Sequence, residues 1–571
     1  MNKTLFLSLL FLVIAPCALC ADTPAVNDFN QLVDQYFDFY FSFHPTEATA
    51  GGLHQYDSKL EDFSAAARQK EIAGLKNLLA KFKAIDSAKL PPDTASDLQW
   101  IISSIHSNLL ELEAIQMWRK DPNRYSGTAN YAIFLILKRH YAPLDERLRS
   151  VIARERQIPK LLETARQNLQ SPPRIYVEIE LEQVSDETDF FRRDVPESIS
   201  AVKDPSLLSE FKSANKAVVD AFESYHKFLH DSLLPKASGD FRLGAEDYRK
   251  KLLYDEMVDV PLDRLLKIGY DDLHRNQEAL TKTAAQIDPK HSVGEVATRL
   301  QHEHPAPGQL MQAFRDTFAG LTQFIHEKKI ITIPESEPPT LEPTPAFLRA
   351  TTEASMDTPG PYEKNREAFF DVTLPDPKWP PTQTEEWMAT FNNSSIPGTS
   401  IHEAYPGHFV QFLYINEVPS KIRKLTFSGT NAEGWAHYCE QMMLDEGYGN
   451  GDPKLRLGQL EDALLRDARY IVGIQLHTGN MTLDEARQFF MKEGFQTAAV
   501  ADVETKRGTS DPTYLMYTLG KLQILKLRED YRKMRGDDFS LQEFHDRFMQ
   551  QGGVPLKIIR KAMLGNDSPT L

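Results

Sequence analysis

HEAYPGH, at residues 402–408, sets two histidines on either side of a glutamate, and EGWAHYCE follows at residues 433–440. A catalytic zinc ion takes three side-chain ligands, commonly histidine and glutamate, and leaves a fourth coordination position for water. Both residue types occur here, on two segments about 25 residues apart. We therefore predict one zinc ion bound by His402, His408 and Glu433, within a helical metal-binding region.

The glutamate beside the first histidine, Glu403, indicates chemistry rather than a purely structural site. A carboxylate next to a zinc ligand can accept a proton from the activated water. A structural zinc site is closed by four protein ligands and needs no adjacent base. We predict that Glu403 is the general base. The alternatives are an exposed helix glutamate and a non-catalytic metal-binding scaffold.

The spacing of the two histidines requires a break in the helix. In the common His-Glu-x-x-His pattern the histidines lie four residues apart on one helix face. His408 is six residues after His402, roughly 120° away around an ideal helix. Pro406 removes a backbone hydrogen bond and clashes with the carbonyl of His402, so it opens the helix. We expect Pro406 and Gly407 to turn His408 back toward the metal.

Two further side chains lie on the same face of the second motif as Glu433. His437 is one turn further along, and Glu440 is one heptad further along. Either could compete with Glu433 as a ligand. We expect His437 and Glu440 instead to support the ligands or to contact substrate.

Four other residues are candidates for work on the substrate. The hydroxyl of Tyr514 or Tyr517 could donate a hydrogen bond to an oxyanion, although the helical spacing of the two also suits core packing. His477 could bind peptide backbone or a carboxylate, or only cap its helix. Arg507, with neighbouring Lys506, could bind a substrate carboxylate, or the two could form a solvated surface pair.

A wider resemblance accompanies these motifs. HEAYPGHFVQ (402–411) and EGWAHYCE resemble the two signature motifs of the bacterial domain of unknown function 885. The likeness spans nearly the whole mature chain, and its further segments are 118–125, 239–248, 367–376, 466–477 and 512–520. That family is similar in pattern to helical zinc metallopeptidases such as carboxypeptidase Taq, angiotensin-converting enzyme and thimet oligopeptidase. Those enzymes have the tighter His-Glu-x-x-His, so the six-residue spacing departs from their pattern.

The resemblance implies a fold and an activity. It implies a mainly α, large two-lobed metallopeptidase-like fold with a deep cleft. A small β element beside the metal helix would bind extended peptide by strand addition. It favours Tyr517 as the oxyanion donor and a carboxypeptidase or dipeptidyl-carboxypeptidase action on a peptide substrate. A zinc amidase or ester hydrolase acting on cell-wall fragments or small amides is the alternative, because the same centre serves both.

The chain divides into four regions by composition. Residues 1–21 have a basic start, a short apolar run and a small-residue end, which is typical of a secretory signal. Residues 22–329 carry helical apolar periodicity. Residues 330–399 are proline-rich, with β-like runs at 330–333 and 368–374, and a flexible linker is the alternative. Residues 400–571 are helical again, and we expect this region to be catalytic.

Local signals locate helices in the last region. Ser400 is a candidate N-cap just before the metal motif. Thr482 and Glu485 have the spacing of a capping box. We expect helices from near residue 431, over 455–477 and over 514–532, and we expect Gln411 to stabilise the distorted end of the metal helix.

The ends and the charge of the chain bear on location and partners. The signal predicts an exported, periplasmic protein. Acylation at Cys17 or Cys20 would make it a lipoprotein, but Pro16 and Leu19 before those cysteines suit that poorly. We expect no other membrane-spanning segment. The net charge of −16 argues against nucleic acid as a partner. The sequence does not fix the oligomeric state.

Overall fold

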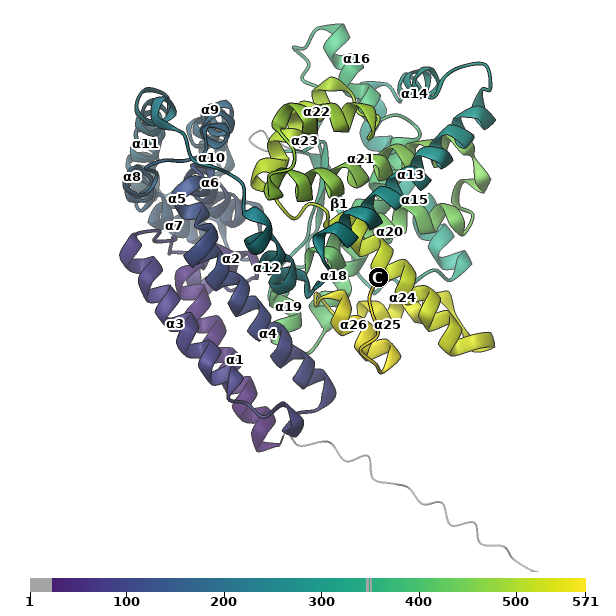
Figure 1. Cartoon of the computed structure of the whole chain (residues 1–571). Helices are drawn as coiled ribbons and strands as arrows, with labels where there is room; N and C mark the ends of the chain where they lie inside the picture. Colours follow the sequence, from purple (N-terminus) through teal and green to yellow (C-terminus); the bar gives the residue numbers. More distant parts are fainter. Residues whose placement is uncertain (1–22, 346–348, 350–351) are drawn as a thin grey trace, which may run out of the picture.

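The computed structural model describes residues 23–345, 349 and 352–571, and it is mainly α-helical with one small sheet. The mainly α fold is thus confirmed, while the expected signal at residues 1–21 lies outside the described residues. Figure 1 shows the N-terminal helices gathered as one bundle at the left and the later helices at the right. The first bundle contains α1 (Pro24–Phe43), α2 (Pro45–Ala50), α3 (Ala65–Lys83), α4 (Pro92–Leu110), α5 (Met117–Lys120), α6 (Asn123–Lys138), α7 (Leu144–Glu155), α8 (Ile158–Asn168), α9 (Arg174–Asp189), α10 (Val195–Ser198) and α11 (Pro205–Phe228).

The second group of helices begins before the proline-rich region and continues to the end of the chain. The helices before the sheet are α12 (Gly244–Glu256), α13 (Leu262–Ile287), α14 (Val293–Gln301) and α15 (Leu310–Lys328). Those after it are α16 (Pro381–Thr390), α17 (Ser395–Glu403), α18 (His408–Glu417), α19 (Lys421–Leu425), α20 (Gly429–Asp445), α21 (Pro453–Thr478), α22 (Leu483–Lys492), α23 (Ala498–Ser510), α24 (Met516–Arg535), α25 (Leu541–Met549) and α26 (Leu556–Leu564).

Apolar packing joins the two groups. Phe37 of α1 and Trp100 of α4 belong to the same buried cluster as Trp435 of α20. The indole of Trp100 also donates a hydrogen bond to the Thr426 hydroxyl at 2.6 Å. Burying aromatic side chains of this size is the main stabilising contribution of such contacts. The packing therefore crosses residue 329, where composition predicts the end of the N-terminal helical region.

The sheet lies entirely within residues 330–399 and has the strand order β1-β3-β2. β1 (Thr340–Pro343) runs parallel to β3 (Phe369–Val372), and β2 (Ala354–Asp357) runs antiparallel to it. All four residues of β3 are buried, whereas β2 is half-buried at one edge of the sheet. The expected strand at 368–374 is confirmed as β3. The strand expected at 330–333 is wrong, since that segment has no regular structure.

The helix boundaries of the last region follow the sequence signals with one exception. Helices α20, α21 and α24 begin and end within a few residues of their expected bounds. The capping box of Thr482 and Glu485 is present at the start of α22. The Ser400 N-cap is wrong, because α17 begins at Ser395 and Ser400 is buried inside that helix.

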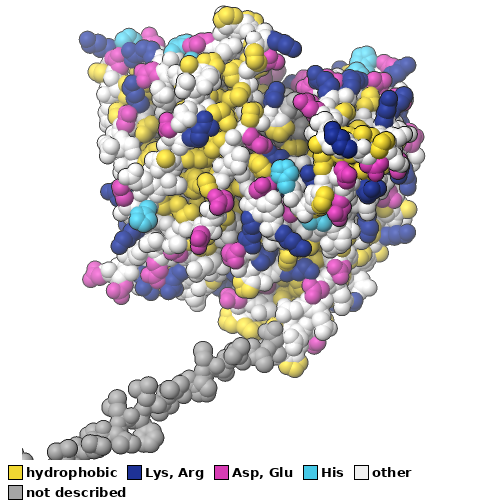
Figure 2. Space-filling view, turned by 180° about the vertical axis from the view of Figure 1, so that it is seen from behind, with side chains coloured by type: hydrophobic (Ala, Val, Ile, Leu, Met, Phe, Trp, Pro, Cys, Tyr) yellow, Lys and Arg dark blue, Asp and Glu magenta, His cyan; other side chains and the backbone are white. Residues whose placement is uncertain are grey.

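Two surface properties bear on partners. Within the described part of the chain, we find no helix with the length and apolar character needed to cross a bilayer. On the face drawn in Figure 2, acidic and basic side chains are interspersed, with hydrophobic side chains between them.

Candidate metal centre

The metal motif is broken at the predicted position. α17 ends at Glu403 and α18 begins at His408, so the two histidines belong to different helices. A Cβ atom on Gly407 would lie 1.8 Å from the His402 carbonyl oxygen, so only glycine fits this turn. The indole of Trp435 donates a hydrogen bond to the Pro406 carbonyl at 2.9 Å. The predicted break is confirmed, and α20 holds it in place.

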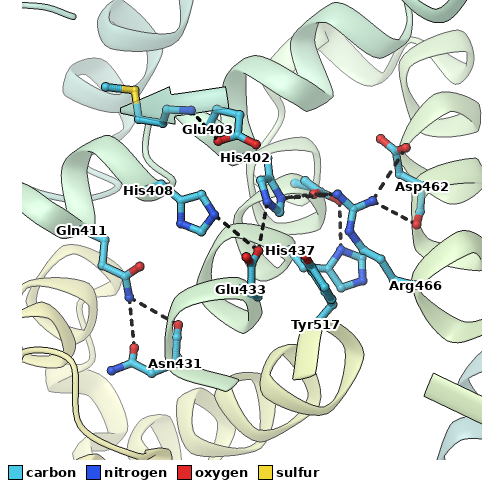
Figure 3. Close-up of polar contacts among 12 residues, drawn as sticks. His402, Glu403, His408, Gln411, Asn431, Glu433, His437, Asp462, Arg466 and Tyr517 are labelled. Atoms are coloured by element: carbon cyan, nitrogen blue, oxygen red, sulfur yellow. Dashed lines mark hydrogen bonds and ion pairs between the residues drawn. The ribbon is translucent and has the colours of Figure 1, made fainter. Parts of the chain in front are cut away.

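The break brings the three expected ligands together. The Nε2 atoms of His402 and His408 each lie 3.4 Å from the same carboxylate oxygen of Glu433. One ligand atom from each residue lies within 4.8 Å of the other two. Figure 3 shows the two imidazoles pointing at the Glu433 carboxylate. Two imidazole nitrogens and one carboxylate oxygen form the donor set of a catalytic zinc ion.

A buried carboxylate orients the first histidine. Glu440 accepts hydrogen bonds from Nδ1 of His402 at 2.6 Å and Nδ1 of His437 at 2.9 Å. Arg466 lies 3.0 Å from the same carboxylate. Since Nδ1 of His402 is used in this way, Nε2 is the nitrogen that faces Glu433 and a metal ion. Glu440 and His437 are fully buried behind the ligands, which favours positioning over contact with substrate.

The electrostatics of the cluster suit a cation. Burial alone would raise the pKa of Glu433, but the imidazoles of His408 and His402 hold it well below its usual range. Burial lowers the pKa of His402, whereas Glu433 and Glu440 together raise it to about 10. Burial lowers the pKa of His437 to about 3, so its ring is neutral. The residues present therefore fit a divalent metal ion, which would replace the proton on Nε2 of His402.

Glu403 lies beside the cluster without joining it. It is the last residue of α17 and is half-buried. One of its carboxylate oxygens accepts the backbone N–H of Met356 at 3.2 Å. Met356 belongs to β2, so the expected base lies between the first histidine and the edge strand (Figure 3).

Tyr517 is next to the metal cluster, and close helix packing explains its position. A Cβ atom on Gly434 would lie 2.4 Å from the Cα of Gly520, so α20 and α24 touch backbone to backbone there. The Tyr517 ring stacks near the His402 ring, with 6.4 Å between centroids. Arg507 donates a hydrogen bond to the Tyr517 hydroxyl at 3.2 Å. The structure thus places Tyr517 beside the centre and brings Arg507 into contact with it.

Arginines surround the Tyr517 ring. The guanidinium groups of Arg466, Arg469 and Arg507 lie 5.7, 5.1 and 5.9 Å from its centroid. Arg469 forms a two-point ion pair with Glu504 at 2.7 and 2.8 Å. Arg466 and Arg507 likewise pair with Glu440 and Asp511, so this side of the centre carries three guanidinium groups balanced by carboxylates.

Tyr514 and His477 make their contacts in the protein interior. Nε2 of His477 donates a hydrogen bond to the Gly508 carbonyl at 2.8 Å, and burial lowers the pKa of the ring to about 4. The Tyr514 ring packs so closely on Gly473 that an added Cβ would lie 2.8 Å from it. Tyr514 belongs to a buried apolar cluster, which favours its core-packing alternative. The His477 ring is buried and bonds a carbonyl of α23, a contact that is neither a cap of its own helix nor part of the metal cluster.

Two weaker expectations also have clear positions. Lys506 forms an exposed ion pair with Glu182 of α9 at 2.7 Å, which is the surface-pair alternative. The Gln411 amide donates to the side chain of Asn431 at 3.0 Å and so ties α18 to the start of α20.

Several contributors to the site carried little or no sequence signal. Trp435 lies inside the second motif, so its motif membership was the one available clue. Arg466 lies on a helix whose likeness to the family was visible, but its contact with Glu440 joins distant segments. Met356 lies in a short strand without a strong apolar pattern, and nothing in the sequence pointed to it.

Two solved structures that are similar to this chain are described as lipoproteins. One from Shewanella oneidensis, described as "a putative lipoprotein of unknown function", is 28% identical, with a TM-score of 0.79. The comparison covers 94% of this chain and 99% of that one. A "putative lipoprotein" from Colwellia psychrerythraea shares the fold at 19% identity and a TM-score of 0.81, covering 95% and 99% of the two chains. No curated protein matches the chain. Residues 45–563 match the family described as "Bacterial protein of unknown function (DUF885)", and the chain belongs to that family.

Proposed function

We propose that this chain is a zinc-dependent peptidase with a two-lobed, cleft-containing fold. The observation that carries the proposal is one arrangement: two imidazoles and Glu433 converge, and Glu403 lies beside them at the edge of a strand. A structural metal site would not need a free carboxylate at that position. The resemblance of the motifs to those of helical zinc metallopeptidases supports the same reading.

The residues divide the chemistry of hydrolysis among themselves. A bound zinc ion supplies an acidified water and a polarised substrate carbonyl. Glu403 accepts one proton from the attacking water as the oxygen–carbon bond forms, and later gives it to the nitrogen as the carbon–nitrogen bond breaks. The Tyr517 hydroxyl donates a hydrogen bond to the oxyanion that develops on the carbonyl oxygen. Glu440 holds the His402 ring in its orientation throughout.

Substrate binding is proposed along β2. Met356 directs its N–H away from β3 and toward Glu403, so this edge of the sheet faces the centre. An extended peptide can pair with such an edge by backbone hydrogen bonds. Arg507 is suited to a terminal carboxylate, because it is half-exposed next to Tyr517. We therefore propose a carboxypeptidase or dipeptidyl-carboxypeptidase action.

The proposed location is outside the cytoplasm. The signal-like start of the sequence supports export, and the descriptions of the two similar structures support the lipid-anchored alternative at Cys17 or Cys20. Intact-mass analysis of the membrane and periplasmic fractions distinguishes a cleaved from an acylated N-terminus.

Mass spectrometry of a mixed peptide library incubated with the protein tests the function. We expect peptide cleavage that is lost on chelation, restored by zinc and reduced roughly 100-fold or more in Glu403→Gln. The product masses show which end is trimmed. A protein that holds one zinc ion but cleaves no peptide would contradict the proposal, and small amides and cell-wall fragments would then be the substrates to assay.

A further inference from the structure

A cavity of about 370 Å³ lies next to the metal centre, between the N-terminal helices and α18. Phe412 of α18 lines it, and the Phe412 ring lies 6.4 Å from the ring of His408. Asp357, the last residue of β2, forms another part of its wall, directly after Met356. The cavity therefore opens where the proposed peptide-binding edge ends and the metal helix begins.

Four aromatic side chains form part of the cavity wall. Phe41, Tyr131 and Phe427 line it together with Phe412. Tyr131 is 48% exposed and Phe427 is 45% exposed, which is a large apolar area for a folded chain to leave uncovered. Concave aromatic surfaces of this kind bind apolar groups.

Four of the five charged side chains on the wall have polar partners among the described residues. Arg139 pairs with Asp357 and also donates to the Thr358 carbonyl at 2.6 Å. Glu363 accepts a hydrogen bond from His54 at 3.1 Å, and Glu47 accepts one from the Tyr40 hydroxyl at 2.8 Å. The fifth, Lys424, lies 5.7 Å from the Tyr362 ring, so a cationic ligand group would meet a like charge, whereas an apolar group would not.

One polar side chain in the wall is unused. Asn416 is 3% exposed, lines the cavity and makes no side-chain hydrogen bond within the described ranges of the chain. His408, Phe412 and Asn416 are four residues apart in turn, so they follow one face of α18. Metal ligand, aromatic ring and free amide are thus arranged in a row leading away from the centre.

We propose that this cavity is the specificity pocket for a large apolar or aromatic side chain of the peptide substrate. The Asn416 amide would form a hydrogen bond with the bound residue. The volume lies within the range of about 300–1,000 Å³ that is usual for ligand pockets. The inference rests on the proposed peptidase function and adds to it the class of side chain that is selected.

The test uses peptides that differ at one position, which carries phenylalanine, alanine, lysine or aspartate. We expect kcat/KM to be about 10- to 100-fold higher for phenylalanine than for alanine at the position that enters the pocket. Tyr131→Ala and Phe427→Ala should each reduce that preference by about 10-fold. Both side chains are half-exposed, so neither variant removes a core contact.

Two further variants sharpen the test. Tyr131→Arg should raise kcat/KM for the aspartate peptide, an effect that loss of structure cannot produce. Asn416→Leu should lower kcat/KM by about fivefold for all apolar peptides, as expected for one hydrogen bond. Met534→Ala, an equally exposed apolar position on α24, is the control and should change nothing.

The outcomes separate this inference from the function it rests on. Cleavage without an apolar preference, or a preference that survives both alanine variants, would overturn the pocket and leave the peptidase standing. Calorimetry measures the affinity of the Glu403→Gln variant for the same peptides. Equal affinity for the phenylalanine and alanine peptides would also overturn the pocket. Absence of any cleavage by a zinc-loaded protein would remove the function and the pocket together.

Discussion

Two fully buried carboxylates, Glu440 on α20 and Glu155 on α7, have opposite surroundings. Glu440 is 1% exposed and contacts two imidazoles and the guanidinium of Arg466. Glu155 is 0% exposed, and its partner is the Asn215 amide at 3.0 Å. Burial would raise the pKa of Glu440, but Arg466 and the two imidazoles bring it well below its usual range. Burial raises the pKa of Glu155 to about 8.

The difference shows that burial alone does not decide whether a carboxyl group in this fold is ionised; its neighbours do. A carboxyl group buried among neutral partners keeps its proton, as Glu155 does, and no cation is needed to balance it. Glu440 keeps its charge because its partners are a guanidinium group and two imidazoles. The charged carboxylate accepts the hydrogen bond that orients the His402 ring. The ionised carboxylate belongs to the metal centre, and the neutral one belongs to the packing of the N-terminal helices.

Removing the charged carboxylate should have the largest effect. Glu440→Ala takes from the mostly buried Arg466 its nearest carboxylate, leaves it Asp462 at 3.7 Å, and releases the His402 ring. We expect a loss of about 3–5 kcal/mol in the free energy of unfolding. Zinc affinity should fall about 10- to 100-fold. Urea unfolding and zinc competition titration measure the two effects. Glu440→Gln has nearly the same side-chain shape and serves as the second variant if Glu440→Ala does not fold. Unchanged zinc affinity in both variants would refute the role of Glu440 in orienting His402.

Removing the neutral carboxyl group of Glu155 should instead raise the free energy of unfolding at high pH. The folded protein holds a proton on Glu155 up to pH about 8, whereas the unfolded chain releases it near pH 4.5. Its contribution to stability is therefore complete below pH 4.5 and is lost as the pH rises to 8. The slope is at most about 1.4 kcal/mol per pH unit. Glu155→Gln should remove this slope and be more stable than the natural protein at pH 9. Equal slopes in urea unfolding across pH 5–9 would contradict this.

The surroundings of Glu440 also depend on how closely α20 approaches α24. A methyl group on Gly520 would lie 2.0 Å from the Thr430 carbonyl oxygen. Gly520→Ala should cost about 1–3 kcal/mol and weaken zinc binding by moving α20. Gly294→Ala in α14 is the matched control, because nothing lies within 4 Å of its added Cβ. The control should gain up to about 1 kcal/mol from helix propensity. If both variants lose the same stability, close packing is not the reason.

An exposed carboxylate should show the smallest effect. Glu182 pairs with Lys506 on the surface, and the two side chains are 60% and 39% exposed. Lys506→Met should change the free energy of unfolding by less than about 1 kcal/mol, and less still in high salt. Thermal unfolding at two salt concentrations is sufficient. A loss comparable to that of Glu440→Ala would mean that exposure does not separate these carboxylates.

The sequence was informative where a rule acts over a few residues. Periodicity predicted the helices, and the clash between Pro406 and the preceding turn predicted the break between α17 and α18. Ser400 misled because serine caps helices well, yet here the helix begins five residues earlier and buries it. The strands β1 and β2 are four residues long and largely half-buried, so they carry no clear alternation.

The site was less predictable where contacts join distant segments. The candidate ligands and Glu403 could be predicted because they lie in two short motifs. The contacts of Arg466 with Glu440 and of Met356 with Glu403 arise only when separate helices and a strand pack together. Tyr514 and Tyr517 have helical spacing in the sequence, but Tyr514 lies in the turn before α24 and Tyr517 lies on that helix, so the two rings have different neighbours.

The break at Pro406 and Gly407 has a consequence for finding related proteins. The interval between two metal ligands is fixed only while both lie on one continuous helix. Once the helix ends between them, the number of residues between the two ligands can vary. The helix break is then the feature that related proteins would share. A scan that demands His-Glu-x-x-His passes over this chain. A pattern with His-Glu, a helix-ending Pro-Gly and then His would gather proteins with the same donor set and would sort them by how the helix is interrupted.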